Sequence, residues 1–412
     1  MKKRVELMAP AGNFESLQAA IDSGADSVYF GVEQLNMRAV ASINFAIEDI
    51  QEIVTRCSDK KIRTYITLNT IVYDHDLNMV KTIVNEAHKH GVSAIVAADH
   101  AVIAYARSIG MEVHISTQVN ITNIETVKFY ALFADTVVLS RELSLNQIKK
   151  ITEAIKREKI TGPKGALIEI EIFGHGALCM AVSGKCYLSL HTHNSSANRG
   201  ACRQNCRKSY HVTDEDGNEL LVDNEYIMSP KDLCTISFLD QVLEAGVSVL
   251  KIEGRGRAAD YVSTTIQCYR EAVDSYIAGV YTKDKIAYWL QQLETVYNRG
   301  FWSGYYLGQH LGEWTNDHPG SKATRKKIFV GIGEHYFTKA GIAQFKIEAY
   351  DVKKGDKMLL TGPTTGVKEF EVDTIMVDDE FVTSANKGET FTLPLDFKIR
   401  NSDKLYKLVD AV

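Results

Sequence analysis

EIFGHGALCMAVSGKCYLSLHTHNSSANRGACRQNCRKSY, residues 171–210, is the stretch around which this chain of 412 residues is organised. It holds four of the seven cysteines, Cys179, Cys186, Cys202 and Cys206, and a fifth, Cys234, follows in SPKDLC. Cysteines crowded in this way, in a chain that we expect to be intracellular, indicate a metal site rather than disulfides. Burial of some of them as free, small hydrophobic side chains is the alternative.

The spacing of the cysteines bears on the kind of metal. Zinc ribbons and knuckles usually pair their ligands as C-x2-C, and no such pair occurs in this sequence. Thiolates supplied at uneven intervals by separate turns are typical of iron–sulfur clusters. The sequence therefore favours an iron–sulfur cluster over zinc.

Strand-like and helix-like segments alternate over the first two thirds of the chain. Amphipathic helical patterns, such as Leu77–His90 and Leu145–Lys156, separate short apolar runs. Eight such runs are predicted to be strands: Arg4–Ala9, Ser27–Gly31, Arg63–Asn69, Ala94–Ala98, Glu112–Ser116, Thr136–Ser140, Ala166–Phe173 and Ser248–Glu253. Strands alternating with helices predict a parallel sheet.

Eight strand–helix units predict an α/β fold closed as a (β/α)8 TIM-like barrel. An open doubly wound sheet is the runner-up, weakened by the lack of G-x-G-x-x-G after the first strand. The cysteine stretch follows strand seven as an insertion before a predicted helix, Lys231–Ala245, which places it at the carboxyl-terminal mouth of the barrel. Tyr261–Gly279 and Ile286–Val296 are expected to be the last helices.

The texture of the sequence changes after a basic segment, Lys322–Lys327, expected to be a linker. From Ile328, short β-rich runs are separated by Lys-Lys-Gly-Asp, Gly-Pro-Thr-Thr-Gly and Asn-Lys-Gly-Glu, which predicts a small all-β barrel. This region resembles the second-domain barrel of translation elongation factors. We expect two domains, residues 1–320 and 328–412.

Polar residues at the carboxyl-terminal ends of the predicted strands are catalytic or binding candidates, because barrel interiors favour aliphatic side chains. Two of the arginines could hold a dicarboxylate, or could simply form ion pairs with nearby glutamates. Glu171 lies in an apolar strand and needs a partner, for which Lys251 is the obvious residue. His175, between two glycines, could approach a ligand closely. The candidates are Asn69, His114, Ser116, Gln118, Arg141, Glu142, Glu171, His175, Lys251, Glu253 and Arg255.

EIFGHGALCMAVSGKC followed by SANRGACRQNCRKSY resembles peptidase family U32, the collagenase-like group. The resemblance implies the same barrel and a [4Fe-4S] cluster held by Cys179, Cys186 and Cys202. Cys234 matches the fourth ligand of some relatives and Cys206 that of others; we assign Cys234, with Cys206 in reserve.

Within that family, the chain is most like the tRNA uridine 5-hydroxylation proteins, whose activity depends on prephenate. We therefore expect Arg141, Glu142, Glu171, His175, Lys251, Glu253 and Arg255 to be catalytic, and Asn69, Gln118, Arg141 and Arg255 to bind prephenate. The expected partners are tRNA and a subunit of the same family. Ribosomal-RNA cytidine hydroxylation, a U32 peptidase and a non-catalytic protein that docks on RNA are the alternatives.

Charge and hydropathy limit the possible partners. The net charge of −5 gives no overall attraction to nucleic acid, so RNA contact must use local patches. One such patch is Arg199, Arg203, Arg207 and Lys208, and another is Lys322 with Arg325, Lys326 and Lys327; both could equally be solvated surface. No run is apolar and long enough to cross a bilayer, and the cytoplasm is the expected location. The protease motifs H-E-x-x-H and G-x-S-x-G are missing.

Overall fold

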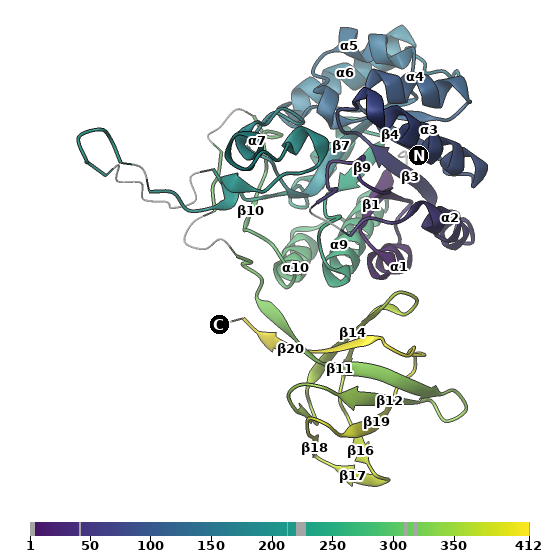
Figure 1. The fold of residues 1–412 in the computed structure, drawn as a ribbon, viewed down its shortest axis with the longest axis vertical. Helices are drawn as coiled ribbons and strands as arrows, with labels where there is room; N and C mark the ends of the chain where they lie inside the picture. The colour runs from purple at the N-terminus through teal and green to yellow at the C-terminus, as the bar shows by residue number, and fades with distance from the viewer. Residues whose placement is uncertain are drawn as a thin grey trace.

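Eight parallel strands close into a barrel in the computed structural model, which describes residues 5–40, 43–211, 213–219, 228–308, 312–315 and 320–411. Neighbouring strands pair in chain order, and the last strand pairs with both the first and the seventh, which closes the ring. The TIM-like fold is therefore confirmed (Figure 1). The barrel strands are β1 (Glu6–Ala11), β2 (Ser27–Gly31), β3 (Arg63–Leu68), β4 (Ala94–Ala97), β5 (Val113–Ile115), β6 (Thr136–Val138), β7 (Glu169–Ala177) and β9 (Val249–Ile252).

Amphipathic helices surround the barrel. In α3, the buried residues Val80, Ile83, Val84 and Ala87 recur at helical spacing and face the strands. Ser144 and Gln147 form a capping box at the start of α6, which satisfies two backbone N–H groups there. The helices are α1 (Phe14–Asp22), α2 (Ile50–Ser58), α3 (Leu77–Lys89), α4 (His100–Ser108), α5 (Ile124–Ala131), α6 (Leu145–Glu158), α8 (Leu239–Glu244), α9 (Ala259–Ile277) and α10 (Lys283–Glu294).

The predicted elements need correction around the cysteine stretch. Lys231–Ala245 is not one helix: it begins with a strand, β8 (Asp232–Cys234), and only then continues into α8. The cause is a long-range pairing, since β8 runs antiparallel to the end of β7, with Cys234 opposite His175. For the same reason β7 extends to Ala177 instead of ending at Phe173. A two-residue strand, β10 (Phe301–Trp302), pairs with β8, and α7 (Leu188–His193) lies between the cysteines.

The first predicted strand, Arg4–Ala9, is observed two residues later, and Arg4 lies outside the described residues. No helix in the described part of the chain is both long and apolar enough to cross a membrane.

The carboxyl-terminal region is an all-β domain, as predicted, and carries its own apolar core. Eight strands form one antiparallel sheet in the order β15-β14-β20-β11-β12-β19-β16-β17, and β13 pairs with β18. The strands are β11 (Arg325–Phe337), β12 (Ile342–Ile347), β13 (Val352–Lys353), β14 (Lys357–Gly362), β15 (Gly366–Glu371), β16 (Ile375–Val377), β17 (Glu380–Val382), β18 (Ser384–Ala385), β19 (Thr390–Pro394) and β20 (Lys404–Asp410).

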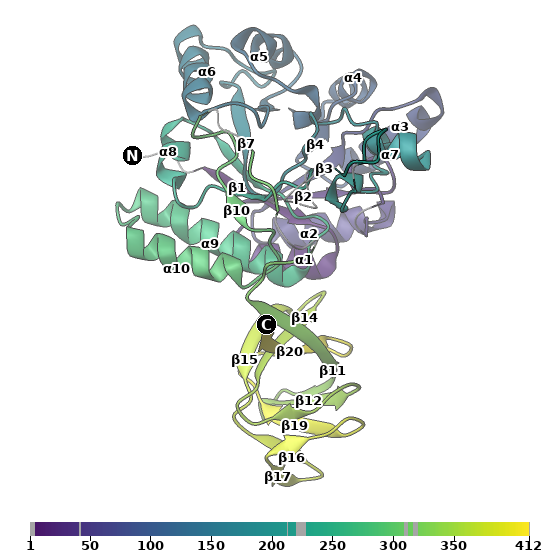
Figure 2. The same cartoon turned by 90° about the vertical axis from the view of Figure 1, so that its left-hand side faces the viewer.

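This domain packs against the outer helices α1 and α9 of the barrel (Figures 1 and 2). The predicted linker is structured, because Arg325–Lys327 already belongs to β11. Lys327 Nζ lies 2.6 Å from Asp260 in α9, and Lys404 Nζ lies 3.0 Å from Glu15 in α1. Part of the predicted RNA-binding patch therefore holds the two domains together.

Candidate active site

A cavity of about 280 Å³ opens at the carboxyl-terminal ends of the barrel strands. Its wall combines strand-end residues, such as Asn69, Lys251 and Arg255, with much of the segment 173–189. Barrel enzymes keep their reactive groups at this end, because the loops that follow the strands converge there. This cavity is the candidate active site.

Four cysteines, Cys179, Cys186, Cys202 and Cys206, line this cavity together. Burial raises the pKa of the Cys206 thiol to about 11, and the other three thiols add to that rise. The four thiols are therefore near enough to interact electrostatically. The structure thus gathers side chains that are up to 27 positions apart (206 − 179).

Cys234 lies apart from this group. It is 4% exposed in β8, where the Tyr269 hydroxyl donates a hydrogen bond to its Sγ at 3.9 Å. Cys234 is not among the residues that line the cavity in the described part of the chain. The sequence assignment placed Cys234 fourth and Cys206 in reserve, whereas the structure places Cys206 with the other three. The pairing of β8 with β7 is the reason, and the ligand role of the cysteines stays a prediction.

The four thiols share one cavity, which is the kind of donor set that the predicted four-iron cluster takes. Within the described residues, no three His, Cys, Asp or Glu side chains are placed to hold one metal ion, and the cluster stays a prediction. In a four-iron cluster each thiolate binds a different iron, so the sulfurs stand farther apart than the ligands of one zinc ion. Four exposed or half-buried thiols around one cavity match that donor set.

Two glycines let the cysteine stretch approach the barrel closely. Gly200 has φ +81°, and a Cβ there would lie 2.1 Å from the carbonyl oxygen of Asn36. Gly184 has φ +70°, and its Cβ would lie 2.5 Å from Oε1 of Gln118. Both the backbone conformation and the contact disfavour any other residue. These glycines hold the cysteines against the segments that follow β2 and β5.

Positive charge dominates the wall of the cavity. Glu253 is the one carboxylate among the described lining residues, against eight cations: Arg38, Arg141, Lys185, Arg207, Lys251, Arg255, Arg257 and Arg299. Clefts lined by one sign of charge concentrate ligands of the opposite sign. The cavity therefore favours an anion.

Arg255 is a buried cation with a hydrogen-bond donor that has no partner within the described residues. It is 5% exposed, and its Nη1 donates to Asn36 Oδ1 at 2.9 Å and to Thr67 Oγ1 at 3.1 Å. Burial lowers the pKa of its guanidinium. Its Nε has no hydrogen-bond partner within the described residues. A buried donor without a partner is costly, and a bound carboxylate would supply one.

Glu253 is a fixed anion. Arg38 donates to its Oε1 through Nε at 3.0 Å, and the Tyr29 hydroxyl donates to its Oε2 at 2.8 Å. Burial alone would raise the pKa of Glu253, but Arg38, followed by Arg255, lowers it to about 2. Glu253 therefore remains ionised across the physiological pH range and fixes Arg38 in the cavity wall, and its catalytic role stays a prediction.

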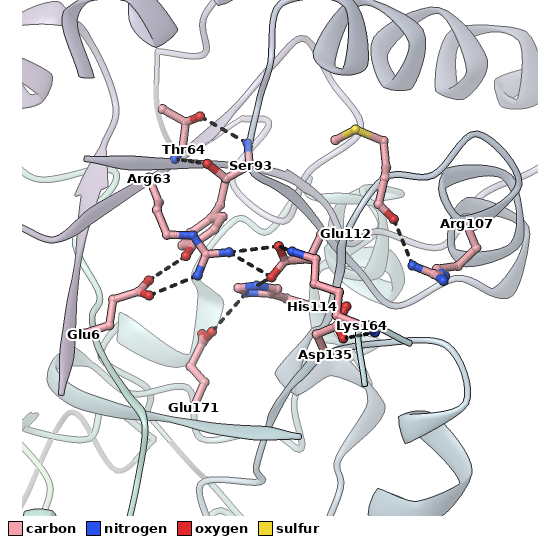
Figure 3. Close-up of polar contacts among 12 residues, drawn as sticks. Glu6, Arg63, Thr64, Ser93, Arg107, Glu112, His114, Asp135, Lys164 and Glu171 are labelled. Carbon is pink, nitrogen blue, oxygen red and sulfur yellow. Dashed lines mark hydrogen bonds and ion pairs between the residues drawn. The ribbon is translucent and has the colours of Figure 1, made fainter. Parts of the chain in front are cut away.

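Glu171 and Lys251 form the predicted ion pair, in which Lys251 Nζ donates to Glu171 Oε1 at 2.9 Å. Lys251 lines the cavity, whereas Glu171 is fully buried below it. Burial opposes ionisation of Glu171, but Lys251 and His114 lower its pKa overall. His114 lies deeper in the barrel, with Nδ1 at 3.8 Å from Glu171 Oε2 (Figure 3).

His175 lines the cavity as a neutral imidazole. It is 2% exposed and is surrounded by the rings of Tyr261, Tyr269 and Phe301. Burial, and then the charge of Arg257, lowers the pKa of His175 to about 3. At neutral pH it can accept or donate a hydrogen bond, but it is a weak base and cannot serve as a general acid.

Of the neighbouring residues Arg141 and Glu142, only Arg141 lines the candidate active site. Arg141 lines the cavity and donates to Ser183 Oγ at 2.6 Å. Glu142 is exposed and lines a second cavity of about 450 Å³ instead. The expectation that both would join Lys251 and Arg255 in one pocket is wrong for Glu142, because it lies one position further along the turn after β6.

The two other predicted binding residues both lie in the cavity wall. Asn69 donates to Ser116 Oγ at 3.1 Å. Oε1 of Gln118 has no hydrogen-bond partner within the described residues, so it is open to a donor from a ligand.

Several site residues were missed by the sequence analysis. Arg38 and Tyr29 come from the β2 region, and only their contacts with Glu253 reveal them. Arg257 and Arg299 both contact Asp232, at 3.3 Å and 3.4 Å, and both line the cavity. The repeated G-R-G-R at positions 254–257 was the available signal for the first of these two.

The predicted basic patch near the cysteines is partly internal. Arg199 forms an ion pair with Asp76 at 2.7 Å. Arg207 donates to the carbonyl oxygen of Leu178 at 2.7 Å, and burial lowers its pKa. Arg203 and Lys208 are exposed. Arg199 and Arg207 are therefore held by contacts within the fold, of which only Arg207 lines the cavity, and the other two cations remain on the surface.

Known proteins that resemble this chain include members of one family over most of its length. The sequence profile of peptidase family U32 matches residues 12–316. A collagenase from Porphyromonas gingivalis (strain W83) is 54% identical over 403 residues, covering 98% of this chain and 97% of that protein.

Relatives named for RNA hydroxylation are also similar. The tRNA hydroxylation protein P1 of Bacillus subtilis is 32% identical over 425 residues, covering 98% of this chain and 95% of that protein. The 23S rRNA 5-hydroxycytidine C2501 synthase of Escherichia coli is 34% identical over 275 residues, covering 66% of this chain and 40% of that protein.

Proposed function

The chain belongs to peptidase family U32, and from that premise we propose that it is an RNA hydroxylation protein acting at C5 of the wobble uridine in tRNA. We further propose that it uses a four-iron cluster and an anionic co-substrate of the prephenate class. The supporting observation is the cavity in which four thiols and an excess of cations meet at the barrel mouth.

Cys179, Cys186, Cys202 and Cys206 would hold the cluster. A four-iron cluster bound there would supply one-electron transfer. The cations of the wall would offset the negative charge of a thiolate-ligated cluster. Of these, Arg38 is near enough to Cys202 for the thiolate to raise the pKa of its guanidinium, after the larger effect of Glu253.

The co-substrate would lie against the arginines. Prephenate carries two carboxylates, and guanidinium groups bind carboxylates through paired hydrogen bonds. Arg255 has an unpaired Nε, and Arg141 reaches the same cavity from the segment after β6. Exclusion of water by the cysteine stretch would strengthen both contacts.

The RNA would approach over the cysteine stretch. Tyr187 is 70% exposed there and Tyr210 is 37% exposed, and aromatic side chains of this kind stack on unpaired bases. The exposed cations Arg203 and Lys208 lie in the same stretch and suit phosphate contacts. A single-stranded anticodon loop presents both bases and phosphates.

Mass spectrometry of tRNA nucleosides from a strain lacking the gene tests this proposal. Complementation with the wild type should restore 5-hydroxyuridine derivatives, whereas Cys202→Ser and Arg255→Ala should not. Cys57→Ser is the matched control, because Cys57 is buried in α2 away from the cavity. Unaltered nucleosides in the deletion strain would refute the proposal.

A peptidase is the second candidate, favoured by the name of the relative at 54% identity. Cysteine-dependent proteolysis needs a thiol in contact with a histidine base. None of the hydrogen bonds formed by described cysteines involves a histidine. Release of peptides from gelatin by wild type but not by Cys202→Ser would favour the peptidase. If wild type releases no peptides from gelatin, the peptidase candidate fails.

A further inference from the structure

Ionisable side chains run through the barrel from its amino-terminal end to the cavity. Barrel interiors are usually filled by aliphatic layers from alternate strands. Here the residues from β1, β3, β5 and β7 include Glu6, Tyr65, His114 and Glu171, all inside the barrel or at its amino-terminal end. Burying such groups costs several kcal/mol per charge unless they are paired, so their alignment needs an explanation.

The lower part of this alignment reaches solvent. Glu112, directly before β5, contacts Lys164 and accepts from Arg63 Nη2 at 2.8 Å (Figure 3). The side chain of Lys164 is 58% exposed and that of Arg63 is 37% exposed, whereas that of Glu112 is 7% exposed. Glu112 is therefore a buried carboxylate in contact with two cations that reach the solvent.

The upper part reaches the cavity. His114 Nε2 lies 3.2 Å from Glu112 Oε1, and on the other side of the ring Nδ1 lies 3.8 Å from Glu171 Oε2. Glu171 Oε1 then accepts from Lys251, which lines the cavity. Each nitrogen of one imidazole therefore faces a different carboxylate.

One step in this series is slightly too long for a hydrogen bond. Neither His114 Nδ1 nor Glu171 Oε2 has another hydrogen-bond partner within the described residues. The two atoms face each other at 3.8 Å, and a shift of about 1 Å brings them within hydrogen-bond distance. Burial opposes protonation of His114, but the two carboxylates outweigh it and raise its pKa.

We propose that Glu112, His114 and Glu171 form a proton relay between solvent at the amino-terminal end of the barrel and Lys251 on the cavity floor. The transfer starts with the ring hydrogen on Nδ1 and with Lys251 as a neutral amine, after Lys251 has given a proton to a group in the cavity. A proton that enters His114 at Nε2 from Glu112 then lets the ring release its Nδ1 proton to Glu171, which passes one on to Lys251. The reverse transfer, from Lys251 back to Glu112, restores the starting tautomer. Only N–H and O–H bonds form and break, and the same steps run in reverse carry a proton outward.

The relay would supply a proton path for the proposed hydroxylation. It rests on the proposed function only for the identity of the ligand in the cavity. Replacing a hydrogen of a pyrimidine ring by a hydroxyl requires that hydrogen to leave its carbon, and a base in the cavity can take it as a proton. Glu253 contacts Arg38 and Tyr29, and His175 contacts the Tyr269 hydroxyl, so these contacts lead to other parts of the barrel wall and not to Glu171. Lys251, also beside the Tyr29 and Phe173 rings, is the lining group that is connected to solvent from below.

The test is the rate at which the ring N–H hydrogens of His114 exchange with solvent, followed by NMR in full-length protein labelled with 15N-histidine. Glu112→Gln keeps the shape and a hydrogen bond to Nε2 but cannot carry a proton, so exchange should slow at least tenfold. Glu86→Gln is the matched control, because Glu86 contacts a surface histidine, His90, at 3.3 Å. An unchanged rate in Glu112→Gln would overturn the relay.

Glu171→Gln interrupts the relay on the other side of the same ring. Exchange through Glu112 should stay within about twofold of wild type, while nucleoside hydroxylation falls at least tenfold and its pH profile shifts. Ring exchange that simply tracks the backbone amide of Ile115, in the same strand, would show that hydrogens escape by opening of the fold and would refute the relay. If wild type hydroxylates no nucleoside, the proposed function fails and the Glu112→Gln exchange rate still decides the relay.

Discussion

Replacing Glu253 by Gln should change how the stability of the protein depends on pH. In the folded protein Arg38 and Arg255 hold the pKa of Glu253 at about 2, compared with 4.5 for a free glutamate. The ionised carboxylate therefore stabilises the fold fully above about pH 4.5, and that stabilisation is lost as the pH falls toward 2. A difference of this size between the two pKa values corresponds to about 3 kcal/mol of unfolding free energy.

Urea unfolding of wild type and Glu253→Gln between pH 2.5 and 7 measures this contribution. The difference between the unfolding free energies of the two proteins should decrease by about 2.5 kcal/mol from pH 7 to pH 2.5, because only the wild type has a carboxylate at position 253 that becomes protonated there. Glu125→Gln is the control, since the Glu125 side chain is 75% exposed. The difference in unfolding free energy between wild type and Glu125→Gln should stay nearly constant over the same pH range. A difference for Glu253→Gln that does not change with pH would refute the ion-pair reasoning.

Three further predictions concern the cysteine stretch and the domain contact. Anaerobically purified Cys206→Ser should lose most of its iron and sulfide, whereas Cys234→Ser should keep both; the reverse result would restore Cys234 as the fourth ligand. Gly200→Ala should lower the free energy of unfolding by at least about 1 kcal/mol, because of its φ of +81° and the contact at 2.1 Å, and an unchanged urea midpoint would contradict this. Lys327→Met should cost only about 0.5 kcal/mol, since its ion pair with Asp260 is partly solvated; a loss above about 2 kcal/mol in urea unfolding would show that this pair dominates domain docking.

Local sequence patterns were sufficient for the barrel and for much of its mouth. The alternation of short apolar runs with amphipathic helices predicted all eight barrel strands, because a parallel sheet requires a crossover after each strand. Once that topology is known, residues at strand ends such as Arg255 and Lys251 must converge at the mouth. The crowding of the cysteines in one insertion placed Cys179, Cys186 and Cys202 at the same end of the barrel.

The missed features all depend on contacts between distant segments. Whether Cys206 or Cys234 joins the other three thiols depends on the pairing of β8 with β7, which the periodicity of a single segment cannot reveal. The contacts of Glu253 with Arg38 and Tyr29 come from segments more than 200 residues earlier in the chain, so no local pattern could reveal them. The sequence by itself determined the architecture and the types of side chain at the mouth. Only the tertiary structure decided which of them meet and which remain ionised, because burial and charge pairing arise when separate strands come together.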